Sequence, residues 1–160
     1  MAQKTNMDTW VYINTTPAET TAAYKRIGEG VTGITPANNP ITDTKHYVNH
    51  QNPTTKVLGT AKQFALAMER YVGDDANDYI AGLAEKIGTD LVTDIVIVDH
   101  YSTELETAKP ARKYEVTVIV NNEGSIVGGG AADMDVVFHV NGDPAVGTFN
   151  ETTAAFTPAT

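Results

Sequence analysis

The sequence has 160 residues, which is enough for one domain with a hydrophobic core of its own. Hydrophobic residues make up 41% of the chain and charged residues 19%, a balance that excludes a wholly disordered protein. The 20 acidic residues outnumber the 11 basic ones, and the net charge of −9 has the wrong sign for binding nucleic acid phosphates tightly. We therefore expect a single acidic domain over residues 1–160.

Further classes of protein are disfavoured by what the sequence lacks. It contains no cysteine, which excludes disulfides, thiolate nucleophiles and cysteine-ligated zinc. Residues 1–8 lack the apolar segment of a signal peptide, and no apolar run approaches the roughly 18 residues of a membrane span. We expect the protein to remain in a cytoplasm and to have no membrane partner.

The first third of the chain combines one strand pattern with a long irregular segment. Residues 10–13, Trp-Val-Tyr-Ile, predict a strand that ends at the turn residues 14–17. Glycine and proline are then frequent from residue 28 to residue 56, which predicts a long loop or a loose hairpin, with some strand character from Ile41 to Val48. Because a loop of this length is usually functional or disordered, we expect it to meet a partner.

The middle of the chain contains one ambiguous segment and one clear helix pattern. The composition of Lys62 to Val72 favours a helix, whereas its apolar residues at positions 64, 66 and 68 alternate as in a strand. In the next segment Asp75 can cap a helix, Asp78 follows three residues later, and an apolar stripe of Ile80, Leu83, Ala84 and Ile87 ends at Gly88. We expect Leu83 and Ile87 to lie in the core.

The second half of the chain has the alternation of antiparallel strands. Residues 95–98 are apolar on both faces, as in a central strand, and Tyr114, Val116, Val118 and Val120 alternate with more polar residues. Met134, Val136, Phe138 and Val140 share one face of a further strand, which we expect to end at a turn over residues 141–144 before a last strand through Phe149. For residues 150–160 we expect either a flexible tail or a C-terminal arm that docks through Phe156.

The candidate catalytic and metal-binding patterns all have simpler explanations. His46 and His50 have a spacing that binds metal on a helix, yet they lie in the irregular segment. The acids at residues 74–78 lack the spacing of a calcium loop, and the Asp-His-Tyr-Ser run at 99–102 points to both faces of a strand. A strand pattern, and not a helix, follows Gly128 to Gly130. We expect no catalytic residue, no metal and no cofactor.

Three stretches resemble the tail tube, or major tail, proteins of long-tailed bacteriophages. They are Tyr71-Val72-Gly73-Asp74-Asp75 leading into Asn77-Asp78-Tyr79-Ile80, the glycine-rich turn before Met134-Asp135-Val136-Val137-Phe138, and Asn141-Gly142-Asp143-Pro144-Ala145-Val146-Gly147-Thr148-Phe149. With the strands between them, the likeness covers residues 60 to 156. It implies a mainly β (α+β) fold, an antiparallel β-sandwich or compact barrel flanked by one short α-helix, and it makes Lys62 to Val72 a strand.

The resemblance also implies a function. Six copies would close into a ring, and rings would stack into the hollow tube of the virion tail, through which DNA passes without specific binding. The implied partners are further copies of the chain, a tape-measure protein, and tail-terminator or baseplate proteins, with assembly in the host cytoplasm. We expect subunit contacts at apolar and aromatic residues of the irregular segment and the C-terminal arm, namely Ile34, Ile41, His46, Tyr47, Val48 and Phe156.

Two other functions compete with this hypothesis. The alternative among binding proteins is another β-sandwich part of a virion, such as a decoration or receptor-binding module, which would expose an aromatic platform or stay a discrete oligomer. A small β-sandwich hydrolase is the alternative among enzymes, and the sequence offers no convergent set of nucleophile, base and metal ligands for it.

Overall fold

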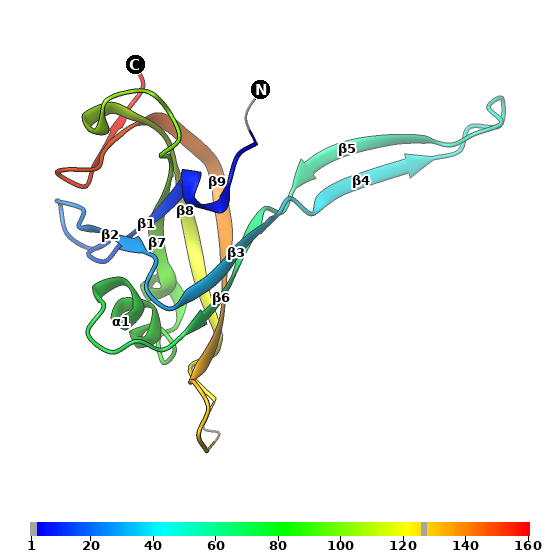
Figure 1. The fold of residues 1–160 in the computed structure, drawn as a ribbon. Coiled ribbons are helices and arrows are strands. Elements are labelled where there is room, and N and C mark those ends of the chain that lie inside the picture. The colour runs from blue at the N-terminus through cyan, green and yellow to red at the C-terminus, as the bar shows by residue number, and fades with distance from the viewer. Residues whose placement is uncertain (1–2, 126–127) are drawn as a thin grey trace.

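Most of the chain belongs to one large antiparallel sheet that curls into half of a barrel (Figure 1). The computed structural model describes residues 3–125 and 128–160. Along the sheet the strands are β2 (Tyr24–Ile27), β1 (Thr9–Asn14), β7 (Val92–Asp99), β8 (Lys109–Asn122), β9 (Asp133–Asn150), β6 (Gln63–Glu69) and β3 (Val31–Ala37), and β10 (Ala155–Pro158) pairs with β9.

The remaining elements lie outside this sheet. A second, two-stranded sheet consists of β4 (Pro40–Lys45) and β5 (Thr54–Thr60), and it projects far from the rest of the molecule (Figure 1). The α-helix is α1 (Asp75–Gly82), and three short 3-10 helices are η1 (Asn6–Asp8), η2 (Gly88–Leu91) and η3 (Glu106–Ala108). The mainly β fold with one short flanking helix confirms the expected fold class.

The large sheet carries a hydrophobic cluster on each face. On the face toward α1, which we call the helix face, Ile80 of the helix and Leu83 at its C-cap pack on side chains such as Ile13, Val116 and Phe138. On the opposite face, here called the open face, a smaller cluster occupies one end of the sheet and contains Tyr12, Tyr24, Val96, Val98, Ala111 and Phe149. Because successive side chains of a strand point to opposite faces, β1, β7, β8 and β9 contribute to both clusters.

The two longest strands, β8 and β9, form the centre of the sheet. β9 runs without interruption for 18 residues, so the turn expected at residues 141–144 is wrong. Lys113 pairs with Ala145 and Glu115 with Asn141, which shows that these turn-forming residues make a bulge beside β8. Gly142 has a φ of +66° there, a conformation that glycine adopts without strain. Because β8 pairs with β9 on both sides of the bulge, β9 continues through it as one strand of the same ladder.

Strand β6 resolves the ambiguous segment in favour of the alternating pattern. Phe64, Leu66 and Met68 are all buried on the helix face, while Ala65 and Ala67 lie on the open face. β6 pairs with β9 on one side and β3 on the other, and these backbone and packing contacts outweigh the helix propensity of its residues. Residues 95–98 of β7 likewise occupy the predicted central position, between β1 and β8.

Helix α1 begins and ends earlier than the sequence pattern indicates. Asp74, one residue before the predicted cap, accepts a hydrogen bond from the backbone N–H of Asn77 at 2.8 Å. The helix ends at Gly82, so Leu83 is still buried but Ile87 is 83% exposed. The expectation that Ile87 lies in the core is therefore wrong, because the chain leaves the helical path before the stripe is complete.

The C-terminal arm docks on its own domain. Strand β10 pairs with β9 in register Phe156 to Phe149, and the Phe156 ring packs at the edge of the cluster on the open face. Lys113 places its Nζ 5.7 Å from the centre of the same ring. The C-terminal arm thus docks through Phe156, but on the sheet of its own chain, whereas we expected Phe156 to contact another subunit.

Leu83→Ala should lower the free energy of unfolding by about 2–5 kcal/mol, since it empties a packed site between α1 and the sheet. Ile87→Ala is the matched control and should change it by no more than about 0.5 kcal/mol, because that side chain contributes little buried area. Urea denaturation of the soluble subunit measures both values. Equal losses for the two variants would show that the helix does not cover the core in this way.

Gly147→Ala should release β10. A Cβ atom at residue 147 would collide with the carbonyl oxygen of Thr157 and would lie 2.8 Å from the Phe156 ring, so the segment must move away. We expect the amides of residues 155–157 to lose protection in hydrogen exchange. Gly59→Ala, in a strand with no neighbouring atom within 4 Å of such a Cβ, is the control and should leave them protected. Unchanged protection in Gly147→Ala would contradict this close packing.

Candidate assembly surfaces

The most prominent surface feature is the projecting hairpin, which we call the arm and define as residues 38–60. It continues the pair β3 and β6 outward, so the predicted long loop at residues 28–56 is instead strand β3, strand β4 and the start of β5. Of the two predictions for this segment, a long loop or a loose hairpin, the hairpin is the correct one. At its base Asn39 has a φ of +42°, and its side-chain amide donates to the carbonyl of Ala61 at 3.2 Å. This side chain holds the two strands together where the ribbon bends.

The arm has almost no core of its own. Nearly all its residues are exposed, including the large apolar side chains Ile41, Tyr47, Val48, Val57 and Leu58. An isolated two-stranded hairpin is at best marginally stable in water, and exposed apolar groups gathered on one element mark a contact surface. The arm therefore has the properties of a segment that is completed by another molecule.

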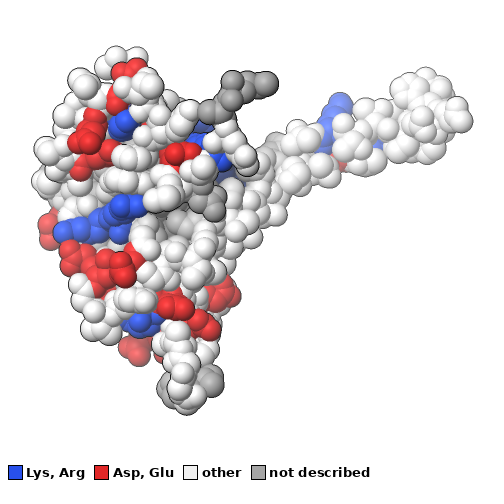
Figure 2. Space-filling model, in the orientation of Figure 1, with Lys and Arg blue, Asp and Glu red and all other residues white. Residues whose placement is uncertain are grey.

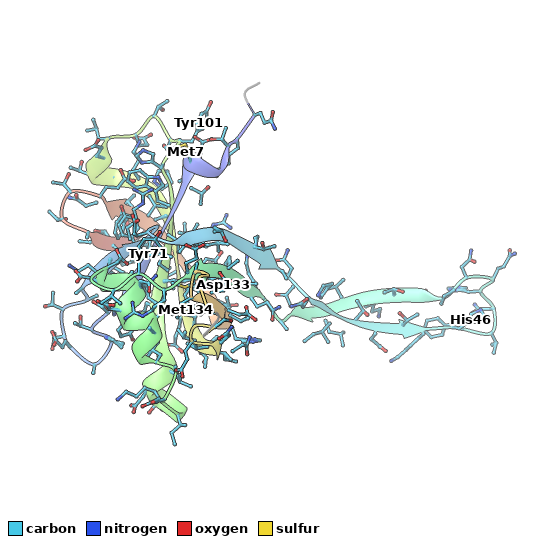
Figure 3. All side chains as sticks on the ribbon, turned by 60° about the horizontal axis from the view of Figure 1, so that its bottom comes forward. Met7, His46, Tyr71, Tyr101, Asp133 and Met134 are labelled. Atoms are coloured by element: carbon cyan, nitrogen blue, oxygen red, sulfur yellow. The ribbon has the colours of Figure 1, made fainter. Side chains whose placement is uncertain are left out.

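The six residues predicted to contact other subunits separate into two groups. Ile41, His46, Tyr47 and Val48 all lie on the arm, and His46 lies near its tip (Figure 3). There His46 Nε2 is 2.8 Å from the carbonyl oxygen of His50, an interaction that closes the tip. Ile34 lies in β3 and packs at the edge of the helix-face cluster, and Phe156 packs on the open face. These two residues are therefore not on the arm.

The open face carries a second surface that the sequence analysis did not identify. Beyond the small cluster, four neighbouring strands expose a row of side chains away from α1: Ala65, Ala67 and Glu69 of β6, Asp133, Asp135, Val137 and His139 of β9, Glu115, Thr117 and Ile119 of β8, and Val92 and Asp94 of β7. This set includes five carboxylates and no lysine or arginine. It is a broad acidic surface on which His139 is the one basic side chain of the set, and Lys113, two residues before Glu115 on the same face of β8, lies at its border against Phe156.

The sequence did contain a signal for this acidic face. Glu115 alternates with the buried Tyr114 and Val116, and Asp133 and Asp135 alternate with Met134 and Val136. Alternation places all these acids on the face away from the core. What could not be read from the sequence is that β7, β8, β9 and β6 lie side by side, which brings the acids together.

At the other end of the open face a polar cluster fixes the connection between β7 and β8. The imidazole of His100 stacks on Trp10 with ring centres 3.7 Å apart, and the Arg26 guanidinium lies 3.8 Å from the centre of the Trp10 ring. His100 Nδ1 is 2.9 Å from the carboxylate of Glu151, a buried group in the turn before β10. Within the run 99–102, His100 thus contacts Glu151 and Trp10, and the hydroxyl of Ser102 instead accepts from the N–H of Glu104.

The half-barrel leaves two sheet edges and a groove near them. Strands β2 and β3 end the large sheet, and each has one side that pairs with no strand among the described residues. A groove of about 790 Å³ lies at the mouth of the half-barrel, with Ile27, Ile34 and Phe64 in its apolar lining and Lys4 and Arg26 among its polar residues. Unpaired edges are the standard route by which one sheet continues into a second chain.

Comparisons with known proteins give no further guide. The sequence matches no protein-family model, and no curated protein is similar to it. Within residues 3–125 and 128–160, no group of three or more histidine or acidic side chains is arranged to hold a metal ion, and no helix has the length and apolar character needed to cross a bilayer. The arm, the acidic open face and the sheet edges are therefore the features that bear on function.

The backbone amides of the arm should exchange with solvent rapidly in the free subunit and become protected when copies assemble. The reason is that its hairpin has little packing to hold it, whereas ordering it against a partner shields its amides. Hydrogen exchange on subunit and assembly, followed by mass spectrometry, measures the difference. If amides at residues 54–60 are already protected in a verified monomer, the arm is stable by itself and the argument for a partner is lost.

Proposed function

We propose that this protein is a structural subunit of a bacteriophage virion, which polymerises as stacked hexameric rings into the hollow tail tube that delivers DNA. The observation that carries the proposal is the acidic part of the open face, four strands wide, where the side chains include five carboxylates, one histidine and no lysine or arginine. Carboxylates repel the phosphates of DNA, so a channel lined by this face lets DNA slide without adhering. The three stretches that resemble tail tube proteins support the same function.

The sheet edges and the arm supply the contacts that a tube requires. A chain whose β2 edge continues the sheet of a neighbour at β3 removes the unpaired edges and closes a ring when the rotation fits. The arm extends well away from the body (Figure 1), and in this proposal it contacts another copy. The tape-measure protein and the tail-terminator or baseplate proteins are the other partners in this proposal, and no residue acts as a catalyst.

A decoration or receptor-binding module is the second candidate. An exposed aromatic platform would favour it, but the exposed large apolar residues are scattered over the N-terminal segment, the arm, the segments that flank α1, the β7–β8 connection and single positions of β8 and β9. On the acidic part of the open face, Ile119 is exposed among acidic and smaller side chains, and no phenylalanine, tyrosine or tryptophan ring accompanies it there. These observations favour the tube subunit, whose acidic surface lets DNA move past it. They do not favour a module whose surface binds a receptor.

Concentrated protein should form long hollow tubes of uniform diameter in negative-stain electron microscopy. Deletion of residues 40–60 should abolish the tubes while leaving a folded body, since the arm forms a sheet separate from the large one. Circular dichroism and thermal unfolding of the deletion variant are the control for folding. Discrete closed particles from the full-length chain, at every concentration at which it stays soluble, would favour the decoration or receptor-binding module.

A further inference from the structure

Two exposed surfaces of the chain complement one another and lie on opposite sides of the body. One is the arm, and the other is the segment that precedes, forms and follows α1, residues 71–90, which we call the helix-side patch (Figure 1). We propose that the arm of one copy docks on the helix-side patch of a neighbouring copy. The identity of the partner as a second copy rests on the proposed function, while the choice of the patch rests on charge, apolar exposure and placement.

The charges of the two surfaces are opposite. The arm contains Lys45 and Lys56 against the single acid Asp43, so it carries a net positive charge in a chain whose total is −9 (Figure 2). The helix-side patch contains five acids, Asp74, Asp75, Asp78, Glu85 and Asp90, and one base, Lys86.

Part of that acidity is already neutralised within the chain. Asp75 lies 2.8 Å from Lys25 and Asp78 lies 2.6 Å from Arg70. Among the described residues, this leaves Asp74, Glu85 and Asp90 against Lys86. The patch is therefore negative even after its internal ion pairs are counted, and complementary charge steers and orients an association.

Both surfaces also expose apolar side chains that their own chain does not cover. On the arm these include Val57 and Leu58, and on the patch Val72 and Ile87 are 86% and 83% exposed, before and after α1. Ile87 completes the apolar stripe of the helix in sequence yet points away from the core. Burial of such side chains between two copies supplies the apolar contribution that charge alone does not.

The placement of the two surfaces fits an assembly of equivalent copies. The arm leaves the body on the side of β3, and α1 lies on the opposite side (Figures 1 and 3). A contact between two different surfaces on opposite sides is heterologous, and it repeats from copy to copy until a ring closes. The groove at the mouth of the half-barrel is a poorer acceptor, because its charged lining residues, Lys4 and Arg26, have the same sign as the arm.

The absence of cysteine from the chain makes a direct cross-linking test possible. Val57→Cys subunits are mixed with Ile87→Cys subunits under conditions of assembly and treated with a short bismaleimide. We expect a cross-linked dimer from the mixture and none from either variant alone. Leu105→Cys replaces Ile87→Cys in the control mixture, because Leu105 is similarly exposed, at 76%, in the connection between β7 and β8.

The outcomes separate this proposal from the proposed function. Tubes that form without a Val57–Ile87 cross-link, or with a cross-link to Leu105 instead, would overturn the helix-side patch and leave the tube function standing. A Val57–Ile87 cross-link in discrete particles would support the docking and contradict the tube. If no cross-link forms and the protein forms no oligomer, the result would contradict both the docking and the tube function.

Charge reversal gives an independent readout. Lys45→Glu with Lys56→Glu should raise the concentration needed for assembly by about tenfold, and Glu85→Lys with Asp90→Lys in the same chain should restore it. Glu104→Lys with Glu106→Lys, two exposed acids outside the patch, should not restore it. The docking on the patch would be overturned if Glu104→Lys with Glu106→Lys restored assembly, or if neither pair of substitutions restored it.

Discussion

The long antiparallel ladder between β8 and β9 is the element on which the rest of the structure depends. These strands have 14 and 18 residues, and their even and odd positions serve opposite faces. One set of positions builds the core beneath α1. The other set builds the small cluster around Phe149 at one end and presents Glu115 and Asp135 to solvent at the other. The same alternation thus fixes both the hydrophobic core and the acidic surface.

A second consequence of this ladder is that the sheet stays open. β7 and β1 extend it on one side, β6 and β3 on the other, and the curl stops before β2 and β3 meet. A single chain can remove such edges only by closing its own barrel, whereas several chains can do so by continuing one sheet around a ring. The arm is the outward continuation of β3 and β6, so the feature that reaches a neighbour is built on an edge of the sheet.

The sequence predicted those parts of the fold that depend on a local apolar pattern. The strands at residues 10–13 and 95–98 follow from short continuous runs of β-branched, aromatic and other apolar residues, and the buried positions 114, 116 and 118 follow from apolar residues repeating with a period of two. The errors lie where a distant contact outweighs a local signal. Turn-forming residues at 141–144 remain in β9 because β8 holds them, and Ile87 leaves the core because the helix ends at Gly82.

The surfaces were harder to predict than the core. The glycine and proline content marked residues 28–56 as unusual in the sequence. Four of the six expected contact residues, chosen largely from this segment, lie on the arm. Nothing in the sequence shows that β7, β8, β9 and β6 are adjacent, because strand order depends on pairing between distant segments. The acidic face became visible only when that order was known.

The central claim is that the open face forms the wall of a channel, and a cryo-electron microscopy map of the assembled protein tests it most directly. The account predicts a hollow tube in which β6, β9, β8 and β7 surround the lumen, with the carboxylates of Glu115 and Asp135 pointing into it and α1 away from it. A map in which α1 lines the lumen, or in which the open face is buried against another copy, would contradict the account.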